Sequence, residues 1–245
     1  MLPQSSKLSE KKRILSLPEL PAPKTVRLKF RKVGKLQYIS HLDLQRTFMR
    51  VITRSCIPAW YTKGFNPHAK LVFSTPLGVG AESECELLDI RIDRDMPLSE
   101  IKDRLNAELT DELRITDAYF PKNDFLEIAY ADYEIVIHTA DISEATVEKI
   151  RETLTRAPLM MTKKSKSGEK EVDIIPMISS FEATLCEGNI MLKATLKASS
   201  TEYLNPELLI SALRNNCGIL SGNIAEEWYT ILRTAIRKED LSIFE

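Results

Sequence analysis

The chain lacks the residue spacings with which proteins hold metal ions. Its four cysteines, at positions 56, 85, 186 and 217, lie 29, 101 and 31 residues apart, and its three histidines form no H-x-x-x-H pair. Zinc and iron–sulfur sites use cysteines that follow one another within a few residues. We therefore expect no intrinsic metal centre and no cofactor. We also expect the cysteines to be buried thiols, because a free cysteine packs like a small hydrophobe.

Long apolar runs are also missing. No stretch of about 18 apolar residues occurs, which excludes a membrane-spanning helix of ordinary length. The first 30 residues contain neither the apolar core nor the small-residue cleavage site of a secretory signal. We expect the chain to stay in the cytoplasm.

Acidic residues are scarce in one part of the chain. Residues 1–81 contain 15 Lys and Arg against 3 Asp and Glu, whereas residues 82–245 contain 19 and 32. Between residues 25 and 81, ten basic residues accompany a single acid, Asp43. A charge asymmetry of this size between two parts of a chain indicates an anionic partner.

The order of hydrophobic patterns predicts the fold. Residues 1–24 contain four prolines and favour a flexible, extended tail or linker. Residues 25–122 then give strand, helix, strand, strand, helix, strand, and residues 123–245 repeat this order with one or two extra strand pieces. This predicts an α+β fold of two tandem ferredoxin-like (βαββαβ) units, with antiparallel sheets and helices on one face. The basic segment at 163–170 predicts an exposed loop or hairpin tip.

The first helix combines an apolar stripe with a basic face. Ser40 is a plausible N-cap and Asp43 a first-turn acid, so the helix should begin at His41. A period of about 3.6 residues places Leu44, Phe48, Val51, Ile52 and Ser55 on one side. Arg46, Arg50 and Arg54 recur every four residues on the opposite side.

Two interpretations of this basic face remain open. It is either a solvated helix surface or a row of guanidinium groups whose planar donors match phosphate oxygens. His41 lies in the first helical turn, where backbone N–H groups favour an anion, and Asp43 is close enough in sequence to orient it. The simpler alternative for His41 is an exposed residue of a capping turn.

The stretch YTKGFNPHAKLVFSTPLGVG, residues 61–80, contains two sets of turn residues around a short strand. The turn alone explains Gly64, Asn66 and Pro67, because glycine permits positive φ and proline fixes φ. It does not explain why Lys63, Phe65, His68 and Lys70 gather beside Trp60 and Tyr61. A mixture of basic and aromatic residues suits stacked bases and phosphates, which makes single-stranded or looped RNA the natural candidate ligand.

The alternation of the following strand is inconsistent. Glu82, Glu84 and Glu86 occupy even-numbered positions, as do Leu88 and the later apolar residues that should be buried. In a regular strand all of these side chains would point to the same face. Either a bulge near Leu87 resets the register, or Glu86 points into a half-buried pocket and pairs with an arginine or histidine. In the second case Glu86, like His41 and His68, is a candidate catalytic residue.

Four ordered motifs, SHLDL, GFNPH, PLGVG and ELLDI, carry a family resemblance. Over residues 25–235 the chain resembles the radical-SAM-linked family, a bacterial domain that occurs alone, fused to a radical-SAM domain or encoded beside one. The resemblance implies a radical-SAM partner enzyme. This chain has no C-x-x-x-C-x-x-C motif, so the iron–sulfur cluster would belong to the partner. The resemblance points to these positions: Ser40, His41, Asp43, Gly64, Phe65, Asn66, Pro67, His68, Glu86 and Asp89.

Three functional hypotheses follow from these patterns. The first is an RNA-binding accessory protein, without catalytic activity of its own, that presents tRNA or rRNA to the partner enzyme. The second is a metal-independent RNA-processing enzyme with His41 or His68 as acid or base, since tandem ferredoxin-like proteins include such endoribonucleases. The third is a protein-interaction module whose basic half docks on an acidic partner.

Overall fold

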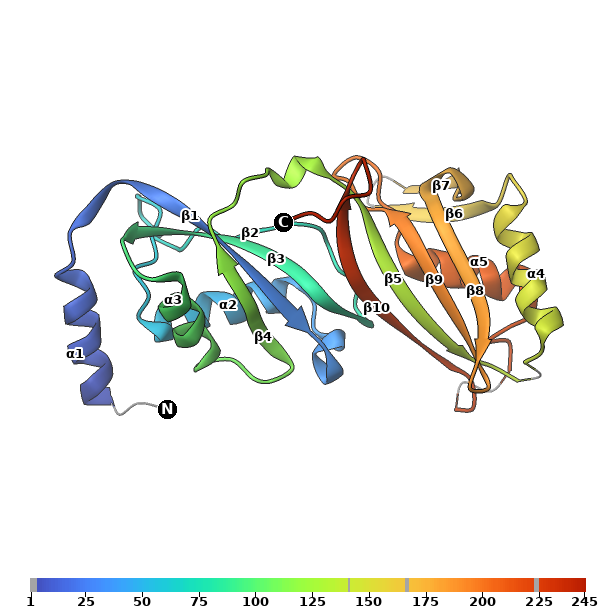
Figure 1. Cartoon of the computed structure of the whole chain (residues 1–245), viewed down its shortest axis with the longest axis horizontal. Helices are drawn as coiled ribbons and strands as arrows, with labels where there is room; N and C mark the ends of the chain where they lie inside the picture. The colour runs from blue at the N-terminus through green and yellow to red at the C-terminus, as the bar shows by residue number, and fades with distance from the viewer. Residues whose placement is uncertain (1–3, 141, 166–167, 223–224) are drawn as a thin grey trace. The chain divides into compact units, whose positions relative to one another are not determined.

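The computed structural model describes residues 4–140, 142–165, 168–222 and 225–245 of the chain (Figure 1). The chain divides into two compact units. The first contains residues 1–124 together with Glu245, and the second contains residues 125–244.

The first unit places helices on a small antiparallel sheet. Its strands pair in the order β4-β1-β3-β2, and every pairing is antiparallel. Apolar residues of β1, β3, α2 and α3 share one buried cluster, so these two helices pack on the same face of the sheet. The elements are α1 (Gln4–Leu15), β1 (Glu19–Lys32), η1 (Gly34–Tyr38), α2 (His41–Ser55), β2 (Val72–Phe73), β3 (Ala81–Arg94), α3 (Leu98–Asn106) and β4 (Leu113–Tyr119).

The second unit has the same order of strands around a similar sheet. Its main strands pair antiparallel in the order β10-β5-β9-β8, and β6 and β7 form a separate hairpin. The basic segment at 163–170 belongs to this hairpin, with residues 166 and 167 outside the described residues. The elements are η2 (Phe125–Glu127), β5 (Ile128–His138), α4 (Glu144–Thr155), β6 (Met160–Ser165), β7 (Gly168–Asp173), η3 (Ile175–Met177), β8 (Ile178–Cys186), β9 (Asn189–Lys197), α5 (Pro206–Cys217) and β10 (Trp228–Lys238). The expected mixed α+β class with antiparallel sheets is confirmed.

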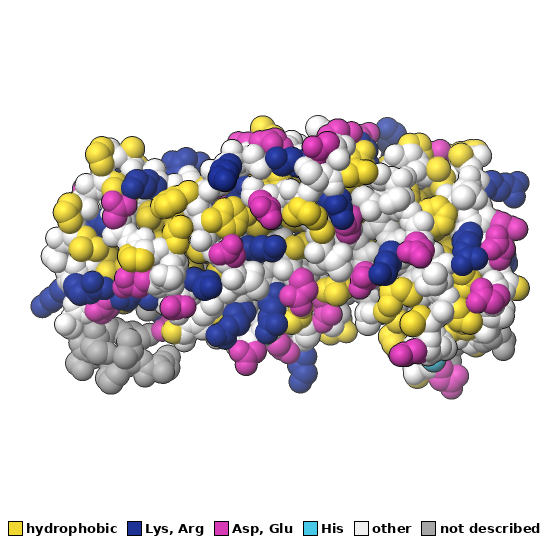
Figure 2. All heavy atoms as spheres, in the orientation of Figure 1, with side chains coloured by type: hydrophobic (Ala, Val, Ile, Leu, Met, Phe, Trp, Pro, Cys, Tyr) yellow, Lys and Arg dark blue, Asp and Glu magenta, His cyan; other side chains and the backbone are white. Residues whose placement is uncertain are grey.

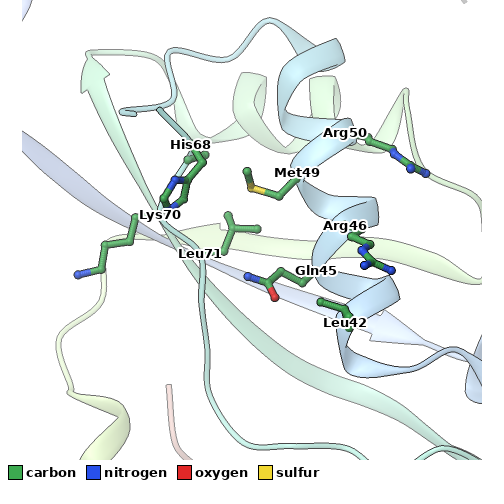
Figure 3. Close-up of a pocket in the computed structure, with 9 residues that line it drawn as sticks. Leu42, Gln45, Arg46, Met49, Arg50, His68, Lys70 and Leu71 are labelled. Carbon is green, nitrogen blue, oxygen red and sulfur yellow. The ribbon is translucent and has the colours of Figure 1, made fainter. Parts of the chain in front are cut away.

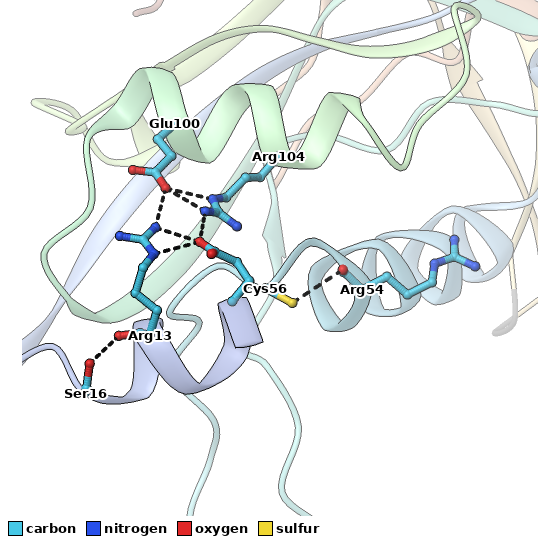
Figure 4. Close-up of polar contacts among 7 residues, drawn as sticks. Arg13, Ser16, Arg54, Cys56, Glu100 and Arg104 are labelled. Atoms are coloured by element: carbon cyan, nitrogen blue, oxygen red, sulfur yellow. Dashed lines mark hydrogen bonds and ion pairs between the residues drawn. The ribbon is translucent and has the colours of Figure 1, made fainter. Parts of the chain in front are cut away.

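The prediction of a flexible tail over residues 1–24 is wrong for the part that the structure describes. Residues 4–15 form α1, and β1 begins at Glu19, within the proline-rich segment. Ile14 is buried in the core cluster of the first unit. Glu10 and Arg13 of α1 form ion pairs with Arg104 and Glu100 of α3 (Figure 4). Docking on α3 orders this segment, and no local sequence pattern reports such a contact.

Truncating Ile14 should therefore loosen α1. We expect Ile14→Ala to lower the free energy of unfolding by about 2 kcal/mol, because it removes buried apolar surface and leaves a cavity. Leu8 on the same helix is 60% exposed, so Leu8→Ala is a matched control expected to cost at most about 0.5 kcal/mol. Urea unfolding and amide hydrogen exchange in α1 measure both effects. Equal effects of the two substitutions would contradict the docking of α1.

Helix α2 has the limits and the buried face that its sequence predicts. It begins at His41 after Ser40, whose Oγ accepts a hydrogen bond from the backbone N–H of Asp43. Its buried residues are Leu44, Phe48, Val51, Ile52 and Ser55. The ring of Phe48 packs edge-on against Phe30 of β1, with 4.9 Å between the ring centroids. These contacts fix which side of α2 faces away from the sheet.

The parity conflict in β3 is resolved by an irregular register. Phe30 pairs with Glu86 and Lys32 with Ser83, so β3 contains one more residue than β1 between these two pairs. Odd-numbered residues are buried before this bulge and even-numbered residues after it. The bulge prediction is confirmed slightly upstream of Leu87. Glu86 nevertheless points inward, with 4% of its surface exposed.

The cysteines divide between buried and accessible positions. Cys85 and Cys217 are buried, but Cys186 is exposed and Cys56 is partly exposed, so the prediction of buried thiols is wrong for Cys186. The described ranges contain no group of three or more His, Cys, Asp or Glu side chains arranged to hold a metal ion. None of the helices described combines the length and the apolar character needed to cross a membrane.

Candidate functional site

The segment between α2 and β2 forms a closed loop with an exposed tip. The backbone N–H of Thr62 donates to the carbonyl oxygen of His68 (2.9 Å), and the N–H of His68 donates to Oγ1 of Thr62 (3.2 Å). An isolated bridge between Tyr61 and Ala69 continues this closure. Gly64 has a φ of 135°, a value open essentially to glycine alone, and no atom would meet a Cβ there within 4 Å. Gly64 is therefore required for backbone reasons, as the turn interpretation predicted.

This loop and α2 together enclose a shallow hollow of about 470 Å³. Figure 3 shows Met49 of α2 and Leu71 of the loop projecting toward the space between the two segments. The charged ends of Arg46, Arg50 and Lys70 extend away from that space at its edges (Figure 3). The hollow therefore has an apolar floor and a basic rim. The residues that line it are Leu42, Gln45, Arg46, Met49, Arg50, His68, Ala69, Lys70 and Leu71.

The three arginines of α2 do not form one uniform ridge. Arg54 pairs with Glu108, with 3.3 Å between Nε and Oε2, and Arg46 pairs with Asp43, with 3.4 Å between Nη1 and Oδ1. The hydroxyl of Ser40, and secondarily the Arg46 guanidinium, lower the pKa of the Asp43 carboxyl below its ordinary value. Arg50 has no carboxylate partner among the residues that the structure describes. Arg50 is the arginine of this helix that remains available to an anion.

The side chains of the loop also divide into those that remain available to a ligand and those that contact other parts of the unit. Lys63 and Lys70 are exposed, and neither pairs with an acid in the described part of the chain. Phe65, at the loop tip, is fully exposed, with a relative exposure of 111%. Trp60 is instead engaged within the unit, because the Arg91 guanidinium lies 5.7 Å from its ring centroid. Three cations without a carboxylate partner in the described part of the chain, Arg50, Lys63 and Lys70, thus lie on α2 and the loop.

Other basic residues of the segment 25–81 gain polar partners when the chain folds. Arg27 of β1 is buried, and its Nε and Nη2 donate to the two carboxylate oxygens of Asp89 at 2.7 and 2.9 Å. Arg31 donates twice to the carbonyl oxygen of Asp111. The whole first unit contains 21 Lys and Arg against 17 Asp and Glu, counting Glu245. Figure 2 shows basic and acidic side chains interspersed on the face it presents.

The three catalytic candidates do not gather in the hollow. His41 is exposed, with its ring edge-on to Phe73 at a centroid distance of 4.9 Å, and it does not line the hollow. Asp43 makes no hydrogen bond to His41 within the described residues, since its carboxylate contacts Ser40 and Arg46. Glu86 is buried opposite Phe30 and does not line the hollow either. His68 alone of the three lies at this site.

Sequence reasoning missed the apolar floor. Leu42, Gln45 and Met49 follow one another at helical spacing of three and four residues, outside the buried stripe of α2. The signal was an apolar pair seven residues apart, Leu42 and Met49, on the otherwise polar side of the helix. The contribution of Leu71 depends on how the loop returns to the sheet, which no sequence spacing reveals.

The family of the chain follows from a comparison with family models. The model described as "Uncharacterized protein conserved in bacteria (DUF2344)" matches residues 25–206. The chain belongs to this family. Residues 42–71 of this DUF2344 chain, which contain the whole lining of the hollow, lie inside the matched segment. No curated protein matches the chain.

Solved structures show distant likenesses to this DUF2344 protein. A chain in the "Crystal Structure of a Cbf5-Nop10-Gar1 Complex" is 11% identical, with a TM-score of 0.46 over 92% of this chain and 57% of that chain. This chain thus spans 57% of the length of that relative. An unknown protein from Galdieria sulphuraria is 10% identical, with a TM-score of 0.25 over 86% of this chain and 99% of that chain. At this distance neither likeness bears on function.

Proposed function

We propose that this protein binds RNA through the hollow between α2 and the loop at residues 61–71. In this proposal it is a cytoplasmic accessory protein, without catalytic activity of its own, that presents tRNA or rRNA to a radical-SAM modifying enzyme. The observation that carries the RNA-binding part is that Arg50 and Lys70, neither paired with a described carboxylate, line the apolar hollow. Lys63, also without such a partner, and the exposed Phe65 lie on the same loop as Lys70.

This grouping fits RNA by its chemistry. Lysine and arginine side chains neutralise phosphates, and binding releases the counterions that surround the nucleic acid. Unpaired bases stack on exposed aromatic rings and enter apolar pockets, which fully paired helices do not permit. A site with both kinds of group at one place is therefore suited to single-stranded or looped RNA.

The radical-SAM partner and the tandem ferredoxin-like fold are two further parts of the proposal, and each has its own support. The motifs SHLDL and GFNPH, which form the N-terminus of α2 and the loop tip, carry the resemblance that implies a radical-SAM partner. The strand orders β4-β1-β3-β2 and β10-β5-β9-β8 support two tandem ferredoxin-like units, because in each unit the first strand lies between the fourth and the third.

Filter binding of a structured RNA such as tRNA across a salt series tests the RNA-binding proposal. We expect log Kd to rise linearly with log salt concentration, with a slope of about 2–3, because about three cations contact phosphates. Absence of binding, or binding that does not respond to ionic strength, would contradict phosphate contacts. Binding of an acidic protein partner in place of RNA would support the interaction-module hypothesis instead.

Incubation of the purified protein with the same RNA tests for catalysis. An accessory protein should leave the RNA intact after prolonged incubation without metal ions. If the wild-type protein cleaves RNA and either His41→Ala or His68→Ala abolishes the cleavage, the protein is an enzyme and the accessory role is wrong.

A further inference from the structure

The hollow has the dimensions and polarity of a site for a small planar group. Its volume of about 470 Å³ lies in the range of about 300–1,000 Å³ that is usual for ligand pockets in proteins. Met49, Ala69 and Leu71 supply apolar surface, and Gln45 and His68 add hydrogen-bonding groups beside it. The residues that line the hollow include no Asp or Glu. Such a site places no carboxylate against an anionic ligand and offers both an apolar floor and polar edges.

We propose that the hollow receives one unpaired nucleobase, turned out of its stack, while the neighbouring base stacks on Phe65. This inference rests on the proposed RNA-binding function and specifies the part of the RNA that is recognised. The occupant is a single unpaired nucleotide, in a bulge or loop, within an otherwise structured RNA.

The hydrogen bonding of His68 leaves one ring nitrogen for the base. Nδ1 lies 3.0 Å from the carbonyl oxygen of Asn66, which accepts hydrogen bonds and donates none. Nδ1 also lies 3.3 Å from Oγ1 of Thr62, but that oxygen accepts from the backbone N–H of His68 and the Asn66 contact is the shorter one. The Asn66 carbonyl therefore favours the tautomer with the proton on Nδ1, which makes Nε2 an acceptor in the neutral ring. An acceptor at the edge of the hollow matches the N–H groups that every nucleobase presents along its pairing edge. The side-chain amide of Gln45 adds a donor and an acceptor on the opposite, helical side.

Hydrogen bonds close the loop that carries Phe65. The mutual hydrogen bonds of Thr62 and His68 close the loop at its base, and the contact of His68 with Asn66 ties the tip to that base. The fully exposed ring of Phe65 contributes no buried surface to the fold, so a base that stacks on it displaces no packing contact of the protein. Phe65 therefore presents an exposed aromatic surface on the same loop that lines one side of the hollow.

The charges complete the match to a nucleotide. Arg50 extends from the helical edge of the hollow and Lys70 from the loop edge (Figure 3). The backbone on either side of an extruded base carries one phosphate in each direction. The side chains of Arg50 and Lys70 extend outward in the free protein, but both are long and rooted on opposite edges of the apolar floor. In the proposed complex they turn to these two phosphates while the base occupies the floor.

RNA hairpins that differ in one nucleotide test this inference. The first hairpin carries a single bulged nucleotide, the second carries an abasic residue at the bulge, and the third is fully paired. We expect the first to bind at least about tenfold more tightly than the other two, because base stacking contributes to affinity and the abasic bulge keeps the phosphates. A 2-aminopurine at the bulge should change its fluorescence when the protein binds.

Two variants connect the effect with the hollow. Met49→Trp fills the floor without changing charge, and Phe65→Ala removes a ring that contributes nothing to the core. Each should abolish or strongly reduce the preference for the bulged hairpin, and both should keep the salt dependence of RNA binding. Phe120→Ala, at an exposed phenylalanine of the same unit, is the matched control and should keep the preference.

The outcomes separate the two proposals. Equal affinity for the bulged and abasic hairpins, or a preference that survives both Met49→Trp and Phe65→Ala, would overturn nucleobase binding and leave salt-dependent RNA binding intact. Failure of all three hairpins and of tRNA to bind would overturn the proposed function itself.

Discussion

Replacing Asp89 with alanine should destabilise the first unit by about 3–5 kcal/mol, because it leaves the guanidinium of Arg27 buried without its carboxylate. The Arg27 side chain is 2% exposed and that of Asp89 is 17% exposed, and two parallel hydrogen bonds join them. Removing one member of such a pair uncovers the full desolvation cost of the other. Thermal unfolding should show a midpoint lower by about 10 °C or more.

An exposed ion pair between β1 and the residue that follows β3 provides the control. Lys24 and Asp95 approach to 2.8 Å, but their side chains are 48% and 73% exposed. Solvent screens such a pair, so Asp95→Ala should cost at most about 1 kcal/mol. If Asp89→Ala were no more destabilising than Asp95→Ala, Asp89 would not be a structural residue. The ELLDI motif would then need another explanation for its aspartate.

Reversing two charges at the hollow should weaken RNA binding by about 100-fold at low salt. The double variant Arg50→Glu with Lys70→Glu removes two phosphate contacts and places two like charges against the RNA. The slope of log Kd against log salt should fall by about 2, since each lost phosphate contact lowers it by about 1. Filter binding of the variant and of the wild-type protein over the same salt series measures both quantities.

A variant with the same change in net charge serves as its control. Lys11 and Lys122 are exposed residues of the first unit that do not line the hollow. The double variant Lys11→Glu with Lys122→Glu should retain most of the affinity and most of the slope. A similar loss in both double variants would show that RNA responds to the overall charge of the protein and not to this site. Unchanged unfolding of both variants would exclude a folding defect as the cause.

Helix α2 and the bulge of β3 could be predicted from local sequence patterns, because each depends on residues that are close together in the chain. The period of the apolar residues in α2 and the cap at Ser40 are properties of adjacent residues, and both appear in the structure at the expected positions. The parity conflict at Glu86 likewise predicted a bulge, because a strand that buries one face cannot change parity without an extra residue. The order of elements in both halves followed from the same periodicities.

The charge asymmetry of the sequence was harder to interpret, because the acidic partners of the basic residues are distant in sequence. Residues 25–81 contain one acid, but Arg27 is neutralised by Asp89 and Arg54 by Glu108. The acids that follow residue 81 fold back on the basic segment, so the large asymmetry of the sequence becomes a small excess in the folded unit. Among the cations left without a carboxylate in the described part of the unit, Arg50 and Lys70 line the hollow.

The tail prediction failed for a related reason. The prolines before residue 24 favour an extended chain. They do not prevent this segment from forming the first part of strand β1, and they do not prevent the preceding residues from forming helix α1. The burial of Ile14 and the ion pairs with α3 stabilise α1 through contacts about 90 residues away in sequence. Interactions of this kind are absent from any local window.

The sequence by itself determined that GFNPH is a turn, that α2 carries arginines away from its apolar stripe, and that basic and aromatic residues gather near residue 65. Only the tertiary structure decided that the loop returns beside α2, that Met49 and Leu71 form an apolar floor between them, and that Arg50 and Lys70 are the cations left at its edges. The turn and the helix could be predicted because they depend on the backbone preferences of adjacent residues and on the spacing of apolar residues along the chain. The hollow exists because the core beneath it, formed by Phe30 and Phe48, fixes how the two segments lie on the sheet.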